Sequence, residues 1–161
     1  MNLKITDLTD IPLHPQLVHY PIVLITISFF FDLVGAVRDS KNWTQFGAVL
    51  LALAVVFALA ALLSGQSAED LIKPMSEDFH NAVEEHENLA TFTFFYILLL
   101  GIAQAWMQIK DKLNSWMRWG YVVLAGISVI LIMRVSHLGG RLVYIHGAGV
   151  QQEAPMPIEN E

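Results

Sequence analysis

NWTQFGAVLLALAVVFALAALLSGQSA, residues 42–68, contains no Asp, Glu, Lys or Arg. About 20 consecutive apolar residues are enough for an α-helix to cross the hydrocarbon core of a bilayer. Inside that core a backbone must satisfy its own hydrogen bonds, and a helix does so. The stretch therefore predicts a transmembrane helix and sets the class of the whole chain.

Three further stretches reach a comparable length. Residues 17–37 are interrupted only by Asp32, and residues 89–109 carry no charge. The fourth stretch runs from the tryptophans at 116 and 119 to about residue 143, but its uncharged part is only 15 residues long, which leaves a re-entrant segment as the alternative.

Four such spans predict an all-α, up-down transmembrane four-helix bundle. We expect a single domain over residues 1–150, followed by a flexible acidic, proline-containing tail over residues 151–161. The small residues of the second span, which recur at Ala54, Ala58, Ala61 and Gly65, predict a face on which a neighbouring helix approaches closely. No internal repeat is evident in the sequence.

The composition of the 161-residue chain agrees with a membrane protein and excludes several classes of function. Hydrophobic residues make up 55% and charged residues 15%, against about 25% charged residues in soluble domains. The absence of cysteine excludes iron–sulfur ligation, zinc–thiolate sites and covalent haem attachment. A net charge of −6 argues against nucleic acid as a partner. No nucleotide-binding or hydrolase motif occurs, so a non-catalytic subunit is a better expectation than an enzyme.

The basic residues predict the orientation of the bundle. The two short loops that share one side hold five of the nine basic residues, namely Arg38, Lys41, Lys110, Lys112 and Arg118. Because loops rich in Lys and Arg stay in the cytoplasm, we expect these loops inside and both termini outside, in a prokaryotic inner membrane.

All six histidines map to the outer ends of the predicted helices. They are His14, His19, His80, His86, His137 and His146. The rise of about 1.5 Å per residue places His19, His86 and His137 in one layer near the outer interface. His86 also belongs to an apolar stripe with Phe79 and Val83, so it should face the interior of the bundle.

Imidazoles at one depth on separate helices favour a b-type haem held without covalent attachment. The first and third spans lie diagonally in a simple bundle, which favours His19 with His86 as axial ligands, with His86 and His137 as the alternative pair. Arg134 and Arg141 are candidates for contacts with the haem propionates. Further cofactor-binding candidates are His14 and His146, and Gly139 and Gly140 leave room for a planar ligand or a neighbouring helix.

A zinc or copper site built on His19, His86 and His137 is the main alternative to haem. For Asp32 we expect an ion pair near the inner interface with Arg38, or a carboxylate that reaches the interface, rather than a proton relay. The acidic cluster of Glu84, Glu85 and Glu87 suits a solvated first turn, and its alternative role is docking a basic electron carrier.

Three motifs carry a resemblance to a known family. HPQLVHYPI at residues 14–22, EEH at residues 84–86 and SHLGGRLVYIHG at residues 136–147 are similar to a family of prokaryotic predicted membrane proteins catalogued as domain of unknown function 2231. The resemblance covers residues 11–150 and implies four spans and a histidine-lined outer pocket. The family's characteristic histidines match His14, His19, His86 and His137, and His146 fits one branch.

The sequence therefore predicts a membrane electron-transfer subunit that binds haem b and exchanges electrons with a larger redox complex, a quinone or a basic soluble carrier. The alternatives are a cofactor-free assembly subunit of a larger membrane complex and a protein that binds or transports divalent zinc or copper.

Overall fold

The computed structural model describes residues 13–69, 76–110 and 114–148, and the regular structure within them is helical. A short helix α1 (His14–Leu17) leads through Val18 into α2 (His19–Val37), and α3 (Lys41–Glu69), α4 (Glu77–Ile109) and α5 (Ser115–Tyr144) follow. The predicted tail, residues 151–161, lies outside the described residues.

Four segments are long and apolar enough to span a membrane: His14–Val37, Lys41–Gly65, Glu77–Ile109 and Ser115–Tyr144. The prediction of an all-α protein with four spans is confirmed. The fourth stretch is one continuous helix from Ser115 to Tyr144 rather than a re-entrant segment. Asn114 caps its N-terminus, where the Asn114 side chain accepts a hydrogen bond from the backbone N–H of Met117 at 2.9 Å.

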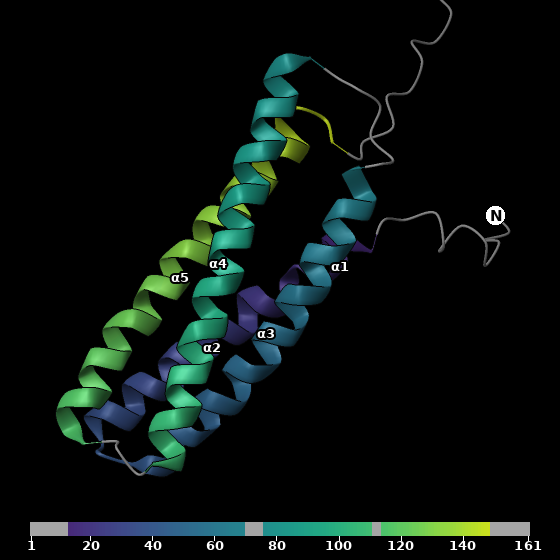
Figure 1. Cartoon of the computed structure of the whole chain (residues 1–161). Coiled ribbons are helices and arrows are strands. Elements are labelled where there is room, and N and C mark those ends of the chain that lie inside the picture. The colour runs from purple at the N-terminus through teal and green to yellow at the C-terminus, as the bar shows by residue number, and fades with distance from the viewer. Residues whose placement is uncertain (1–12, 70–75, 111–113, 149–161) are drawn as a thin grey trace, which may run out of the picture.

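The helices form a ring in which each of them contacts two neighbours. Both α2 and α4 pack against α3 and α5, so α2 and α4 face each other across the bundle axis, as the sequence predicted for the first and third spans. Figure 1 shows the rods side by side, with α1 and the last turn of α5 at the same end. We call this the outer end.

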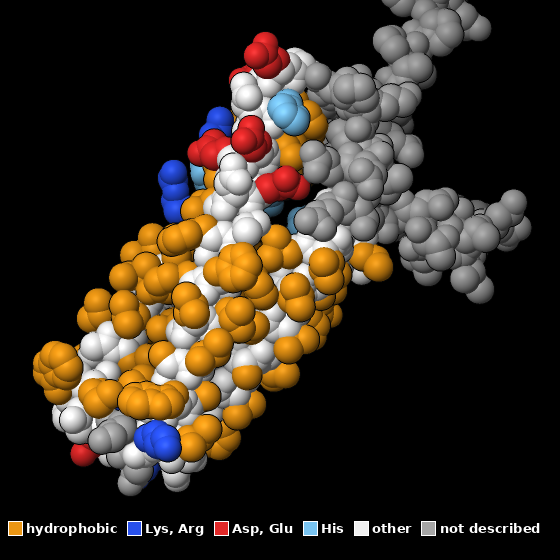
Figure 2. All heavy atoms as spheres, viewed as in Figure 1, with side chains coloured by type: hydrophobic (Ala, Val, Ile, Leu, Met, Phe, Trp, Pro, Cys, Tyr) orange, Lys and Arg blue, Asp and Glu red, His pale blue; other side chains and the backbone are white. Residues whose placement is uncertain are grey.

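The face of the bundle shown in Figure 2 is mostly hydrophobic, and charged side chains gather beyond the hydrophobic surface at the outer end, over α4 and α5. At about 1.5 Å per residue, the 33 residues of α4 measure about 50 Å, which exceeds the roughly 30 Å hydrocarbon core of a bilayer. The first turns of α4 therefore stand outside the apolar layer.

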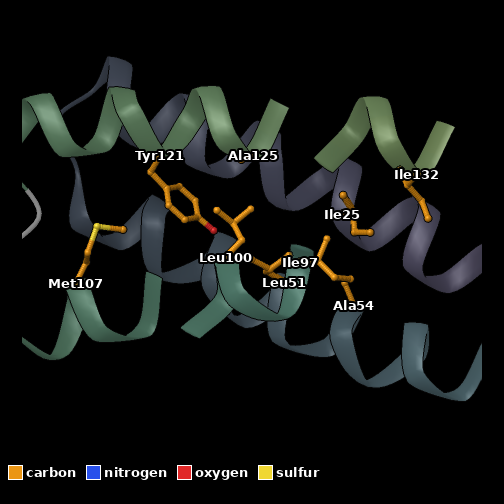
Figure 3. Close-up of a cluster of buried hydrophobic side chains, with 9 residues drawn as sticks. All are labelled: Ile25, Leu51, Ala54, Ile97, Leu100, Met107, Tyr121, Ala125 and Ile132. Carbon is orange, nitrogen blue, oxygen red and sulfur yellow. The ribbon is translucent and has the colours of Figure 1, made fainter. Parts of the chain in front are cut away.

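The core consists of apolar side chains from all four long helices (Figure 3). Ile25 and Ile97 are 1% and 0% exposed, and the small residues Ala54 and Ala61 are buried as the stripe on the second span predicted. Because lipid is as apolar as these side chains, their close packing, rather than exclusion from water, holds the helices together.

The buried residues recur at fixed offsets, which reveals a repeat that the sequence did not show. On α2 the buried positions Pro21, Ile25, Ser28, Asp32 and Gly35 correspond, 72 residues later, to the buried positions Thr93, Ile97, Leu100, Gln104 and Met107 on α4. On α3 the buried positions Thr44, Gly47, Leu51 and Ala54 correspond, 74 residues later, to the buried positions Arg118, Tyr121, Ala125 and Ser128 on α5. The bundle is thus two similar helical hairpins that face each other with the same burial pattern.

The packing of Ile97 can be tested against an exposed isoleucine on the same helix. Ile97→Ala opens a cavity in the core and should lower the free energy of unfolding by about 2 kcal/mol or more. Ile102, which is 57% exposed, provides the control. Ile102→Ala should change the free energy of unfolding by about 0.5 kcal/mol or less. Reversible unfolding in detergent measures both. Equal losses would contradict the assignment of the core.

Candidate functional site

His14, at the start of α1, lies against the outer end of α3. Its Nδ1 lies 2.9 Å from the backbone oxygen of Ala61 and 3.1 Å from Oγ of Ser64. The ring also packs on Gly65, where an added Cβ would lie 3.1 Å from Cε1 of His14. A glycine at this position therefore lets the imidazole approach the backbone of α3.

His86, on α4, meets α5 in the same way. A Cβ added to Gly139 would lie 3.2 Å from Cε1 of His86, and the backbone carbonyl of Val135 is within hydrogen-bonding reach of the ring. Nδ1 of His86 is buried and makes no hydrogen bond with the described residues. The sequence prediction that His86 faces the interior is consistent with this position.

The two histidines occupy equivalent positions in the two hairpins. His86 follows His14 at the offset of the α2–α4 repeat, and Gly139 follows Gly65 at the offset of the α3–α5 repeat. In each hairpin the carbonyl that faces the imidazole belongs to the residue four positions before the glycine. The imidazoles are close enough to interact electrostatically, and we call them the His14–His86 pair.

This arrangement is suited to ligation by imidazole. A backbone carbonyl only accepts hydrogen bonds, so the Nδ1 of His14 that faces Ala61 must carry the proton. Nε2 then holds the free lone pair that a metal requires, and such a hydrogen bond fixes both the tautomer and the ring orientation of metal-binding histidines. On His86 the buried Nδ1 is a nitrogen that still lacks a partner.

The structure places His14 beside His86 and leaves His19 exposed. His19 lies six positions before Ile25 on α2, which turns its side chain by about 120° away from the face that carries this buried residue. The ligand pair of His19 and His86, predicted from their shared depth, the diagonal position of their spans and the apolar stripe of His86, therefore has one exposed member.

The predicted site residues of α5 also lie apart from the pair. Arg134, His137 and Arg141 are exposed and project from the face of α5 opposite Gly139, at 100° per residue. They do not approach the His14–His86 pair. His146 is half-buried, with its ring edge-on to Phe79 at 5.9 Å between centroids, one to two turns beyond His86.

No group of three or more His, Asp or Glu side chains that would hold a metal ion occurs in the part of the chain that the structure describes. Of the three histidines predicted to form a zinc or copper site, His19 and His137 are exposed and His86 is half-buried. The His14–His86 pair offers two nitrogen ligands.

A second polar cluster, around Asp32, lies toward the inner end. Asp32 is 2% exposed and accepts a hydrogen bond from Nε2 of Gln104 at 2.7 Å. The expected ion pair with Arg38 is wrong, because the Arg38 guanidinium lies over the ring of Trp43, 5.7 Å from its centroid. The alternative of a carboxylate that reaches the interface is wrong as well, since Asp32 points into the core.

Comparison with known proteins gives one family. The sequence profile described as "Predicted membrane protein (DUF2231)" matches residues 10–152. Neither the curated proteins nor the solved structures gave a match.

The contact between the His86 ring and Gly139 can be tested by substituting Gly139 and its neighbour Gly140. Gly139→Ala places a methyl group against the imidazole, whereas Gly140→Ala meets nothing within 4 Å. We expect Gly139→Ala to be less stable to thermal unfolding than Gly140→Ala by about 1 kcal/mol, since overpacking costs about 1–3 kcal/mol and alanine otherwise favours a helix. In a His86→Ala background the difference should disappear. A difference that persists there would show that His86 does not occupy this position.

Proposed function

We propose that this chain, which belongs to the family of predicted membrane proteins matched above, is a membrane electron-transfer subunit that binds a b-type haem non-covalently through His14 and His86. The observation that carries the proposal is the pair of imidazoles, each seated on a glycine and each facing a backbone carbonyl of the neighbouring helix.

The ligand set fits this cofactor. Haem iron in electron-transfer proteins takes two axial imidazoles, supplied in helical bundles by side chains that project inward from facing helices. His14 and His86 come from the two different hairpins and are close enough to interact electrostatically, and each retains a ring nitrogen for ligation. When bound, haem supplies a one-electron couple.

The residues around the pair have positioning roles. The Ala61 carbonyl orients the His14 ring, the Val135 carbonyl faces the His86 ring, and Gly65 and Gly139 allow both rings to approach the helices. On the outer side of His86, the buried Phe79 and Val83 limit the access of water. A low-polarity surrounding of this kind is one of the levers by which a protein sets the potential of a haem.

A bound divalent ion, such as zinc or copper, is the second candidate. Its specific support is the position of Arg134 and Arg141, which face away from the pair and leave haem propionates without the predicted guanidinium partners. An ion held by the same two imidazoles requires no such partners.

For the setting we propose a prokaryotic inner membrane with the histidine end outside, as the distribution of Lys and Arg favours. The exposed Glu77, Asp78, Glu84 and Glu85 of α4 give this end an acidic surface. Such a surface complements a basic soluble electron carrier. The second redox partner, which exchanges electrons with the same haem, is a membrane quinone or a larger redox complex.

The ligand assignment is tested by optical spectra of the full-length protein, purified with haem supplied during expression. The reduced protein should give the sharp α-band of a bis-histidine haem. His14→Ala and His86→Ala should each abolish the band, because each removes one axial ligand. His80→Ala should retain it, since the exposed His80 lies outside the pair.

The other outcomes separate the alternatives. A colourless protein that retains zinc or copper through His14 and His86 after treatment with a chelator would support the ion site and contradict haem. Loss of the band in His19→Ala and His137→Ala, but not in His14→Ala, would contradict the proposed pair. A colourless, metal-free protein that co-purifies with one fixed partner would support the assembly role.

A further inference from the structure

The cluster around Asp32 lies far from the His14–His86 pair and has no part in the function proposed above. Its members come from all four long helices. Tyr121 donates through its hydroxyl to Oε1 of Gln104 at 2.9 Å, and Gln104 donates through Nε2 to Oδ1 of Asp32 at 2.7 Å. This chain of donors fixes the orientation of the Gln104 amide.

The other side of the carboxyl group faces Ser28 and Gly47. The Ser28 hydroxyl is within hydrogen-bonding reach of the Asp32 carboxyl, but its proton is directed to the backbone oxygen of Gly47 at 2.8 Å. A Cβ added to Gly47 would lie 2.6 Å from Oδ1 and 3.1 Å from Oδ2. The glycine therefore makes the space that the carboxyl group fills.

Within the described chain, the second oxygen of the Asp32 carboxyl group lacks a hydrogen-bond donor. Oδ2 of Asp32 is buried and accepts no hydrogen bond from the described residues. The one hydroxyl proton nearby, that of Ser28, is already donated to Gly47. A proton on Oδ2 removes both the buried charge and the need for a donor at this oxygen.

No cation offsets a charge at this position. Among the described side chains, Asp32 forms no ion pair with Lys or Arg. The Arg118 guanidinium bonds Asp39 at 2.6 Å, and Arg38 stacks over Trp43. The groups that face Asp32 are the hydroxyl of Ser28 on α2, the backbone of Gly47 on α3 and the amide of Gln104 on α4, with the neutral phenol of Tyr121 from α5 behind that amide. An isolated buried carboxylate is costly, and ionisable residues inside a membrane mark functional sites.

We propose that Asp32 is an intramembrane proton-binding site, in which Oδ2 holds the proton while Oδ1 accepts the hydrogen bond from Gln104. Asp32 lies six residues before Arg38, about 9 Å along the helix from the inner end, so the inner aqueous phase is the nearer source of the proton. Gln108, which donates to the backbone oxygen of Thr44 at 3.2 Å, extends the polar groups in that direction.

Infrared spectroscopy of the full-length protein in bilayers provides the first test. At neutral pH the spectrum should contain the C=O stretch of a protonated carboxyl group in an apolar environment, with a shift in heavy water. Asp32→Asn should remove this band and keep the Gln104 contact, because an amide has nearly the same shape. Asp39→Asn, which changes the exposed partner of Arg118, should leave the band unchanged. Loss of a carboxylate band in Asp32→Asn would overturn the proposal.

Carbodiimide labelling gives a second test, and its main result comes from the unsubstituted protein. Dicyclohexylcarbodiimide is apolar and reacts with protonated carboxyl groups, so mass spectrometry of digested protein should find the adduct at Asp32. Gly47→Ala, which crowds the carboxyl group, should lower the yield severalfold. Protection of Asp32 by sodium ions but not by choline would reassign the site to a metal cation and contradict the proposal. An unlabelled Asp32 together with a carboxylate band would also contradict it.

Discussion

Lipid offers no hydrogen bonds, and this constraint governs where the polar groups of the bundle lie. A polar side chain on an apolar helix must find its partner inside the protein or reach the interface. Asp32 and Gln104 meet across the bundle axis, and Arg118 pairs with Asp39 at the inner end. His14 and His86 meet backbone carbonyls at the outer end. These contacts fix the rotation of each helix, since a turn of about 100° would expose them to lipid.

The two hairpins satisfy the constraint with the same positions. Both begin at the outer end, so the repeats run in parallel about an axis along the membrane normal, an arrangement also found in transporters. The histidines and their glycines preserve this symmetry, whereas the central contact breaks it by pairing a carboxyl group with an amide. In the same layer Gly47 leaves space in one hairpin where Tyr121 fills it in the other. The symmetric outer end suits a ligand shared by both hairpins, and the asymmetric cluster toward the inner end suits a site with one acidic group.

The number of spans, their approximate limits and the inward direction of His86 could all be predicted, because uncharged runs and helical periodicity are local signals. The partner of His86 could not be found from depth, which does not report the face of a helix. A weak signal was present in the sequence, because the position at +11 is an isoleucine and the position at +18 is polar, counted from His14 as well as from His86. This shared spacing on the two helices identifies His14 as the equivalent of His86, and Asp32 as the equivalent of Gln104. The positions of Arg134 and Arg141 relative to the pair required the packing of α5 against α4.

The central claim, that the two hairpins bring His14 and His86 together, is tested most directly by cross-linking in the membrane. The natural chain has no cysteine, so two introduced thiols report one distance without background. A His14→Cys/His86→Cys protein should cross-link with a short bifunctional thiosulfonate. His14→Cys/His137→Cys, which places one thiol on the outward face of α5, should not cross-link with the same reagent. Efficient cross-linking of the second protein and none of the first would contradict the account.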